Sequence, residues 1–242
     1  MEGKNIVSNK EQINQTLTDI CTVFNDTKID YCLVGALSGY LQSGGEIIRE
    51  HDDLDFMLNE NDIEAVQELL NRHSEFGFSL NDTRAHPCDI VKGIDRRGKL
   101  ITYNDSHEHD IYALHKSSPF HLGFFAYERT HDGVLQKQFF KDERTGQAVI
   151  KARKTKMIDW QRNYTNKIIH NGLKITCNDI HLVLAIKETL IANENRPKDT
   201  FDMAHLKSIN PYIDPQRIQA ERQKRVGAET LIYFADTKEQ YK

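Results

Sequence analysis

The spacing of apolar and polar positions predicts helices and strands in turn along the first third of the chain. Residues 11–25 place apolar side chains every three or four positions, which is the spacing of an amphipathic helix. The apolar run 31–34 stops at Gly35, a pattern typical of a buried strand that enters a turn. The elements predicted next are a short helix at 37–43, a strand at 54–58 and an amphipathic helix at 62–73.

The pattern changes twice in the rest of the chain. From residue 76 to about residue 149 it has the period of strands, and after residue 176 it returns to that of helices. This order predicts an α+β fold, with an α/β domain over residues 1–170 and a C-terminal helical region over 171–242. The predicted strands lie at 76–80, 89–92, 100–103, 111–115, 120–129 and 134–140, and the predicted helices at 180–193, 198–207 and 216–225.

Composition indicates an ordinary soluble protein. The chain has 242 residues, 38% hydrophobic and 28% charged, which suffices for one sizeable core and a second small domain. No apolar run approaches the roughly 18 residues of a membrane span, and no signal-peptide core follows the first residues, so we expect a cytoplasmic protein without a membrane partner. The net charge of -4 argues against broad, unspecific binding of nucleic acid. One basic run, at 151–156, is either a solvated face or a contact for phosphates.

Asp53 and Asp55 are the first candidates for chemistry. Residues two apart in a strand project from the same face, so the two carboxylates would lie side by side while Leu54 points into the core. Neighbouring carboxylates repel each other, and a divalent cation removes the repulsion. Mg²⁺ commonly uses one or two carboxylates together with substrate phosphates. The pair therefore predicts a Mg²⁺ or Mn²⁺ site; the alternative is a polar strand start at the surface.

The turn at Gly35 strengthens this interpretation. A glycine after an apolar strand permits close approach of the backbone to a phosphate, and Ser38 in the following helix is able to donate a hydrogen bond. Taken alone, Gly35 is equally explained as a simple turn glycine. An apolar strand, a glycine turn, a short helix and an Asp-x-Asp strand in this order form a much more specific pattern.

Together these residues resemble a known superfamily. Gly35-Ala36 followed by Arg49-Glu50-His51-x-Asp53-x-Asp55 is similar to the polymerase-β-type nucleotidyltransferases, and most of all to their small lincosamide- and aminoglycoside-modifying members. The segment 196–206 resembles the late acidic helix of that superfamily, and Lys187 stands where relatives often have a phosphate-facing lysine. The resemblance implies a nucleotidyltransferase-like mixed β-sheet with flanking helices.

One departure from the superfamily concerns its third carboxylate, which lies on a later strand next to the Asp-x-Asp strand. The best match to that later strand is the run 120–125, in which the carboxylate position falls on Gly123. Three explanations stay open. The match is out of register and Asp89 or Asp110 has the role, Asp110 reaches the site from a neighbouring strand, or catalysis is lost or altered.

The resemblance implies a reaction as well as a fold. Mg²⁺ would bridge the phosphates of a nucleoside triphosphate such as ATP, an acceptor hydroxyl would attack the α-phosphate, and pyrophosphate would leave. The implied metal ligands are Asp53 and Asp55, the further catalytic carboxylate is Asp110, and the nucleotide contacts are Gly35, Ser38, Arg49 and Lys187.

The acceptor and two rival functions stay open. A small-molecule hydroxyl is the expected acceptor, and nucleic acid or protein acceptors are not excluded by the pattern. Asp199 or Asp202 either orients that acceptor or serves as a helix cap that pairs with Arg196 or Lys198. The segment 44–48 also resembles LicD- and fukutin-type phosphotransferases, which use a CDP-linked donor. A catalytically inactive binding protein of nucleotidyltransferase fold is the second rival.

Overall fold

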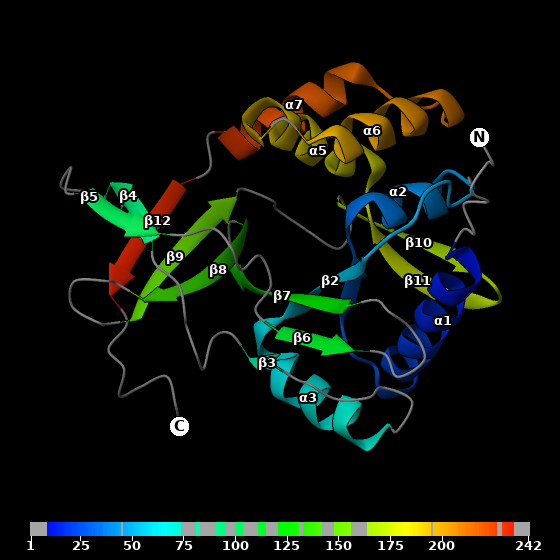
Figure 1. Cartoon of the computed structure of the whole chain (residues 1–242), viewed down its shortest axis with the longest axis horizontal. Helices are drawn as coiled ribbons and strands as arrows, with labels where there is room; N and C mark the ends of the chain where they lie inside the picture. Colours follow the sequence, from blue (N-terminus) through cyan, green and yellow to red (C-terminus); the bar gives the residue numbers. More distant parts are fainter. Residues whose placement is uncertain are drawn as a thin grey trace, which may run out of the picture.

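One mixed β-sheet runs through the computed structural model of the chain, and helices cover both of its faces (Figure 1). None of the helices in the described part of the chain is both long and apolar enough to cross a membrane. The structure describes residues 9–44, 46–73, 81–82, 91–94, 100–103, 111–114, 121–130, 133–141, 148–155, 164–194, 196–226 and 229–234.

The helices follow the apolar stripes that predict them. A 3₁₀ turn, η1 (Glu60–Asp62), leads into the third of them, and Pro197 starts the helix expected at 198 because proline suits the first helical position. Their bounds are α1 (Lys10–Thr27), α2 (Gly35–Gln42), α3 (Ile63–Arg72), α5 (Ile180–Glu194), α6 (Pro197–Ile209) and α7 (Pro215–Val226).

The described strands number twelve, and ten of them form the large sheet. Its order is β10-β11-β1-β2-β7-β8-β9-β12, with β6 beside the first half of β7 and β3 beside β6, while β4 and β5 pair only with each other. The bounds are β1 (Tyr31–Leu33), β2 (Asp53–Asn59), β3 (Asn81–Asp82), β4 (Val91–Ile94), β5 (Leu100–Tyr103), β6 (Ile111–Leu114), β7 (His121–Thr130), β8 (Gly133–Lys141), β9 (Ala148–Thr155), β10 (Thr165–His170), β11 (Leu173–Asn178) and β12 (Glu229–Phe234).

Alternation along β2 sorts its side chains between the two faces of the sheet. Leu54, Phe56 and Leu58 enter a core that α1 and α3 close from one side, together with apolar residues of β1, β7 and β11. Met57 enters a second cluster on the opposite face, which includes Leu182 of α5. The face that carries Asp53 and Asp55 is therefore the one that the C-terminal helices cover.

The C-terminal helices pack on α2 as well as on the sheet. A third apolar cluster joins Tyr40 of α2 to Val183 of α5, Leu206 of α6 and Ile218 of α7. A Cβ atom added to Gly39 would lie 2.9 Å from Leu206 Cδ1, so the absence of a side chain there allows α2 and α6 to approach closely.

The mixed-sheet α+β architecture predicted from the sequence is confirmed, and most elements coincide with their predicted ranges. Five strands, β3, β9, β10, β11 and β12, were not predicted. The basic run lies largely in one of them, β9, and the predicted C-terminal helical region contains two strands, β11 and β12, that join the sheet. The division at residue 170 stays a prediction, and the strand predicted at 76–80 lies outside the described residues.

Gly39→Ala is expected to destabilise the protein by about 1 kcal/mol. Alanine gains up to about 1 kcal/mol of helix propensity over glycine, but overpacking a full core costs about 1–3 kcal/mol. Leu206 is fully buried, so its methyl groups cannot simply move aside. Urea denaturation checks the sign. In a Leu206→Ala background the same substitution is expected to be neutral or stabilising, and an equal loss there would contradict the packing argument.

Candidate active site

Asp53 and Asp55 lie on one face of β2, and both side chains are partly exposed. Gly35 faces this pair from the end of β1, because a Cβ atom built on it would lie 3.9 Å from Oδ2 of Asp55. The N–H of Val34 donates to the carbonyl oxygen of Asp55 at 2.9 Å, which fixes the turn against the strand. The structure thus brings together the carboxylate pair and the glycine turn that the sequence singles out.

Gly35 starts α2 with a backbone that suits only glycine well. Its φ is +72°, in the left-handed region that most residues with a side chain avoid. Ser38, which was expected to contact a phosphate, has a different role. Its side chain is fully buried, and its hydroxyl donates to the carbonyl oxygen of Gly35 at 3.1 Å, so it braces the turn from inside.

The segment between α2 and β2 has no regular structure, yet long-range hydrogen bonds fix it. The side chain of Asn9 donates to the carbonyl oxygen of His51 at 2.8 Å, and the N–H of His121 donates to the carbonyl oxygen of Asp52 at 3.1 Å. Arg49 is fixed through its guanidinium group. Hydrogen bonds to α6, to β7 and to the residue before α1 therefore fix the segment that leads to Asp53.

Asp202 of α6 is the partner of Arg49. Its carboxylate accepts from Arg49 Nε at 2.7 Å and Nη2 at 2.8 Å, from Tyr40 Oη at 2.6 Å and from Lys187 Nζ at 2.9 Å. Burial alone would raise the pKa of Asp202, but the hydrogen bonds from Arg49 and the charge of Lys187 outweigh it and hold that pKa well below its usual range. Asp202 is therefore ionised and fully enclosed, and these donors occupy the oxygens that the alternative prediction gave to an acceptor.

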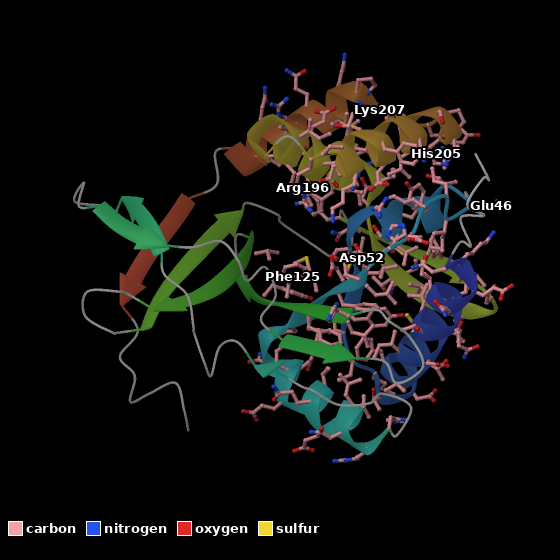
Figure 2. All side chains as sticks on the ribbon, in the orientation of Figure 1. Glu46, Asp52, Phe125, Arg196, His205 and Lys207 are labelled. Atoms are coloured by element: carbon pink, nitrogen blue, oxygen red, sulfur yellow. The ribbon has the colours of Figure 1, made fainter. Side chains whose placement is uncertain are left out.

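Lys187 of α5 is enclosed as well. Its ammonium group lies 2.6 Å from Oδ1 of Asp199, whose other oxygen lies 3.0 Å from Nε of Arg196. Only 5% of Lys187 is exposed. The predicted phosphate contacts of Arg49 and Lys187 thus differ from the structure, in which both cations bind buried carboxylates instead. The alternative prediction for Asp199, an ion pair with Arg196, is found in the structure, whereas Asp202 pairs with Arg49 and Lys187 and not with Arg196 or Lys198. Arg196 is labelled in Figure 2.

His51, in the same irregular segment, is neutral. Burial, followed by the nearby charge of Arg49, lowers the pKa of His51 to about 4. Its ring packs edge-on against Tyr40 with centroids 6.0 Å apart, so it fills space beside the ion cluster rather than adding charge to it.

Strand β7 shows what stands next to each aspartate. In the parallel pairing of β2 and β7, Asp53 lies beside His121 and Asp55 lies beside Gly123. The strand expected next to the Asp-x-Asp strand is thus the one found there, and its position beside Asp55 is a glycine. Asp89 and Asp110 lie outside the described residues, so their predicted roles stay predictions. The described residues contain no group of three or more His, Cys, Asp or Glu side chains placed to hold a metal.

The residues present suit a metal that arrives with its own oxygen ligands. Two carboxylates from one strand face are what Mg²⁺ commonly takes from a protein when substrate phosphates supply further ligands. Gly35 lies opposite Asp55 with no side chain in between, at the N-terminus of α2, where N–H groups attract anions. A metal-bound phosphate would meet carboxylate ligands for its metal and backbone N–H donors for its oxygens here.

Comparison with known proteins adds a fold relationship. No protein-family model and no curated protein sequence matches the chain. Among solved structures it is similar to the solution structure of the antibiotic-resistance factor ANT(2'')-Ia, at 7% identity and a TM-score of 0.53 over 88% of this chain and 91% of the other. The crystal structure of ANT(2'')-Ia with adenylyl-2''-tobramycin gives 8% identity and a TM-score of 0.52 over 89% and 98%. The chain has the fold of this aminoglycoside nucleotidyltransferase.

Arg49→Met is expected to lower the free energy of unfolding by about 3 kcal/mol, because it leaves the buried Asp202 short of two hydrogen bonds and one compensating charge. Lys207→Met is the matched control. It breaks a pair between α6 and Glu188 of α5 at 3.0 Å whose lysine is partly exposed, and such pairs contribute at most about 1 kcal/mol. Equal losses in guanidinium denaturation would show that the Asp202 cluster contributes no more than a surface pair.

Proposed function

We propose that the protein is a Mg²⁺-dependent nucleotidyltransferase that moves a nucleoside monophosphate from a nucleoside triphosphate to a hydroxyl acceptor. One observation carries the proposal: Asp53 and Asp55 share a face of β2 directly opposite the positive-φ Gly35 that starts α2. The fold shared with ANT(2'')-Ia supports it, since that protein was solved with an adenylylated aminoglycoside.

Each part of this site has a task in the proposed reaction. Asp53 and Asp55 would hold Mg²⁺, which when bound offsets the charge that develops on the attacking and leaving oxygens. The backbone around Gly35 would bind the triphosphate tail, and Ser38 would keep that turn in shape from beneath. Arg49, which interacts electrostatically with Asp53, would contribute positive charge without touching the nucleotide.

We further propose a small-molecule hydroxyl as the acceptor. Helices α5 and α6 lie over the sheet face that carries the two aspartates, and in Figure 2 Arg196 lies on the side of these helices that faces the sheet. The acceptor would bind on the sheet face of the aspartate pair, and the C-terminal helices over that face would contribute to its selection. The ANT(2'')-Ia complex shows the same fold with such an acceptor in adenylylated form.

Asp53→Asn and Asp55→Asn are each expected to remove Mg²⁺-dependent nucleotide binding while the fold stays intact. A bound ligand at a hundred times its Kd stabilises a protein by about 2.7 kcal/mol, so wild type should show a clear thermal shift with Mg²⁺ and a non-hydrolysable nucleoside triphosphate. Both variants should show none, and their turnover should fall at least about a hundredfold. Wild-type shifts in both variants would rule out this site.

The identity of the leaving group separates this function from a phosphotransferase with a CDP-linked donor. A nucleotidyltransferase releases pyrophosphate, whereas a phosphotransferase releases a nucleoside monophosphate. A coupled pyrophosphate assay over a panel of hydroxyl acceptors makes the distinction, with EDTA as the metal control. Release of cytidine monophosphate from a CDP-linked donor, with no pyrophosphate from any triphosphate, would replace the proposal with its rival.

Gly35→Ala is expected to remove nucleotide binding as well as about 1–2 kcal/mol of stability, the usual cost of a side chain in the left-handed region. Gly172→Ala is a matched control, since Gly172 has a φ of +79° in the β10–β11 turn and open space around its Cβ position. The control should lose similar stability and keep full affinity. If Gly35→Ala also keeps full affinity, the turn does not bind the nucleotide.

A further inference from the structure

One buried carboxylate joins three separate elements around the candidate site. Asp202 on α6 is 0% exposed, and it binds Tyr40 on α2, Arg49 in the segment before β2, and Lys187 on α5. Each of its oxygens accepts two of these hydrogen bonds, which fills the capacity of a carboxylate oxygen. Asp202 therefore has no free acceptor position for a substrate or metal.

Two of the three elements carry the halves of the proposed donor site. Helix α2 starts at Gly35, five residues before Tyr40, and β2 starts at Asp53, four residues after Arg49. Arg49 is also close enough to Asp53 to interact with it electrostatically. The residues hydrogen-bonded to Asp202, Tyr40 and Arg49, therefore lie only five residues after the glycine turn and four residues before the aspartate pair.

The geometry of these bonds is restrictive. The two parallel bonds between Arg49 and Asp202, at 2.7 and 2.8 Å, fix the plane of the guanidinium group as well as its position. Tyr40 donates at 2.6 Å to the same oxygen that accepts from Arg49 Nε, so α2 and the β2 approach are held relative to each other. The partly exposed Lys207–Glu188 pair between α5 and α6 does not fix the donor site in this way, because it contacts neither α2 nor the segment before β2.

We propose that Asp202 is a positioning residue for the metal-bound nucleotide. It sets the distance between the Gly35 turn and the Asp53–Asp55 pair, and it makes that distance depend on the C-terminal helices. The inference rests on the proposed function, and it extends that function to a residue that touches no substrate. It also assigns Arg49 and Lys187 to the scaffold of the site, in place of the direct phosphate contacts expected from the sequence.

Because Asp202 is negatively charged, the two possible roles of Arg49 and Lys187 predict opposite changes in nucleotide affinity when Asp202 is replaced by asparagine. If Arg49 and Lys187 served as phosphate ligands, removing the competing negative charge with Asp202→Asn would free them and tighten nucleotide binding. If Asp202 positions the site, the same substitution loosens Arg49 and weakens binding. Substitutions behind metal ligands typically cost about 10–100-fold in affinity or activity, so we expect a loss in that range.

The experiment measures affinity for the Mn²⁺ complex of a non-hydrolysable nucleoside triphosphate by isothermal titration calorimetry. Circular dichroism at the same temperature confirms that each variant is folded. Tyr40→Phe removes one hydrogen bond to Asp202 without changing charge, and it is expected to weaken binding in the same direction by a smaller factor. Lys207→Gln is the control and should bind like wild type; Figure 2 places Lys207 on the side of the helices away from the sheet. The electron paramagnetic resonance spectrum of bound Mn²⁺ should broaden in Asp202→Asn and stay unchanged in the control.

Wild-type or tighter binding by Asp202→Asn overturns the proposal. If that variant does not fold, Tyr40→Phe decides, and wild-type affinity there overturns it equally. Failure of the proposed function looks different, because Asp53→Asn would then bind the Mn²⁺–nucleotide complex like wild type, or wild type would not bind it at all.

Discussion

The buried carboxylate of Asp202 is the interaction on which the arrangement around the site depends. Removing an aspartate, an arginine and a lysine from water costs several kcal/mol for each ion, and only complete hydrogen bonding offsets such a cost. Here each oxygen of Asp202 accepts two hydrogen bonds. Arg49 and Lys187 together carry one positive charge more than Asp202 balances, and Asp199 offsets part of it through Lys187. A cluster of this kind adds little net stability over apolar packing, but it tolerates few alternative geometries. Its effect is to fix α2, α5, α6 and the approach to β2 relative to one another.

The alternation of buried and exposed side chains along β2 allows Asp53 and Asp55 to be partly exposed on a strand whose other face is packed in the core. Leu54, Phe56 and Leu58 anchor the strand in the core under α1 and α3, while Asp53 and Asp55 stay partly exposed on the opposite face. A shift of one residue in register would exchange the two sets and bury both carboxylates in the apolar core. The core that stabilises the fold therefore also specifies which face of the sheet carries the two aspartates. Gly35 completes that face, because the strand pairing that holds Val34 against Asp55 places the turn directly over it.

Local patterns predicted the elements whose burial is one-sided, and missed those whose burial depends on distant partners. The apolar stripe of α3 and the alternation of β2 are visible within a few residues. Strand β10 is polar and largely exposed along its length, and only its pairing with β11 makes it a strand.

The Asp53–Asp55 pair was predictable because two-residue spacing is enough to place two side chains on one face. The partners of Arg49 and Lys187 were not, since a cation suits a phosphate and a carboxylate equally well. The deciding residue for Arg49 lies 153 positions away.

The neighbour of Asp55 on β7 bears on how the site would work. Because Gly123 stands in register with Asp55, and His121 with Asp53, these two positions of β7 add no negative charge beside the pair. The described part of the site has two carboxylates, which attract a bare divalent cation less strongly than three would and also repel a triphosphate less. Mg²⁺ readily satisfies the rest of its shell with phosphate oxygens. Under the proposed function, the described part of the site would therefore be better suited to receive the metal already bound to its nucleotide than to hold it in advance. Such a site depends on exact spacing between Gly35 and the aspartates, which is the distance that the buried ion cluster controls.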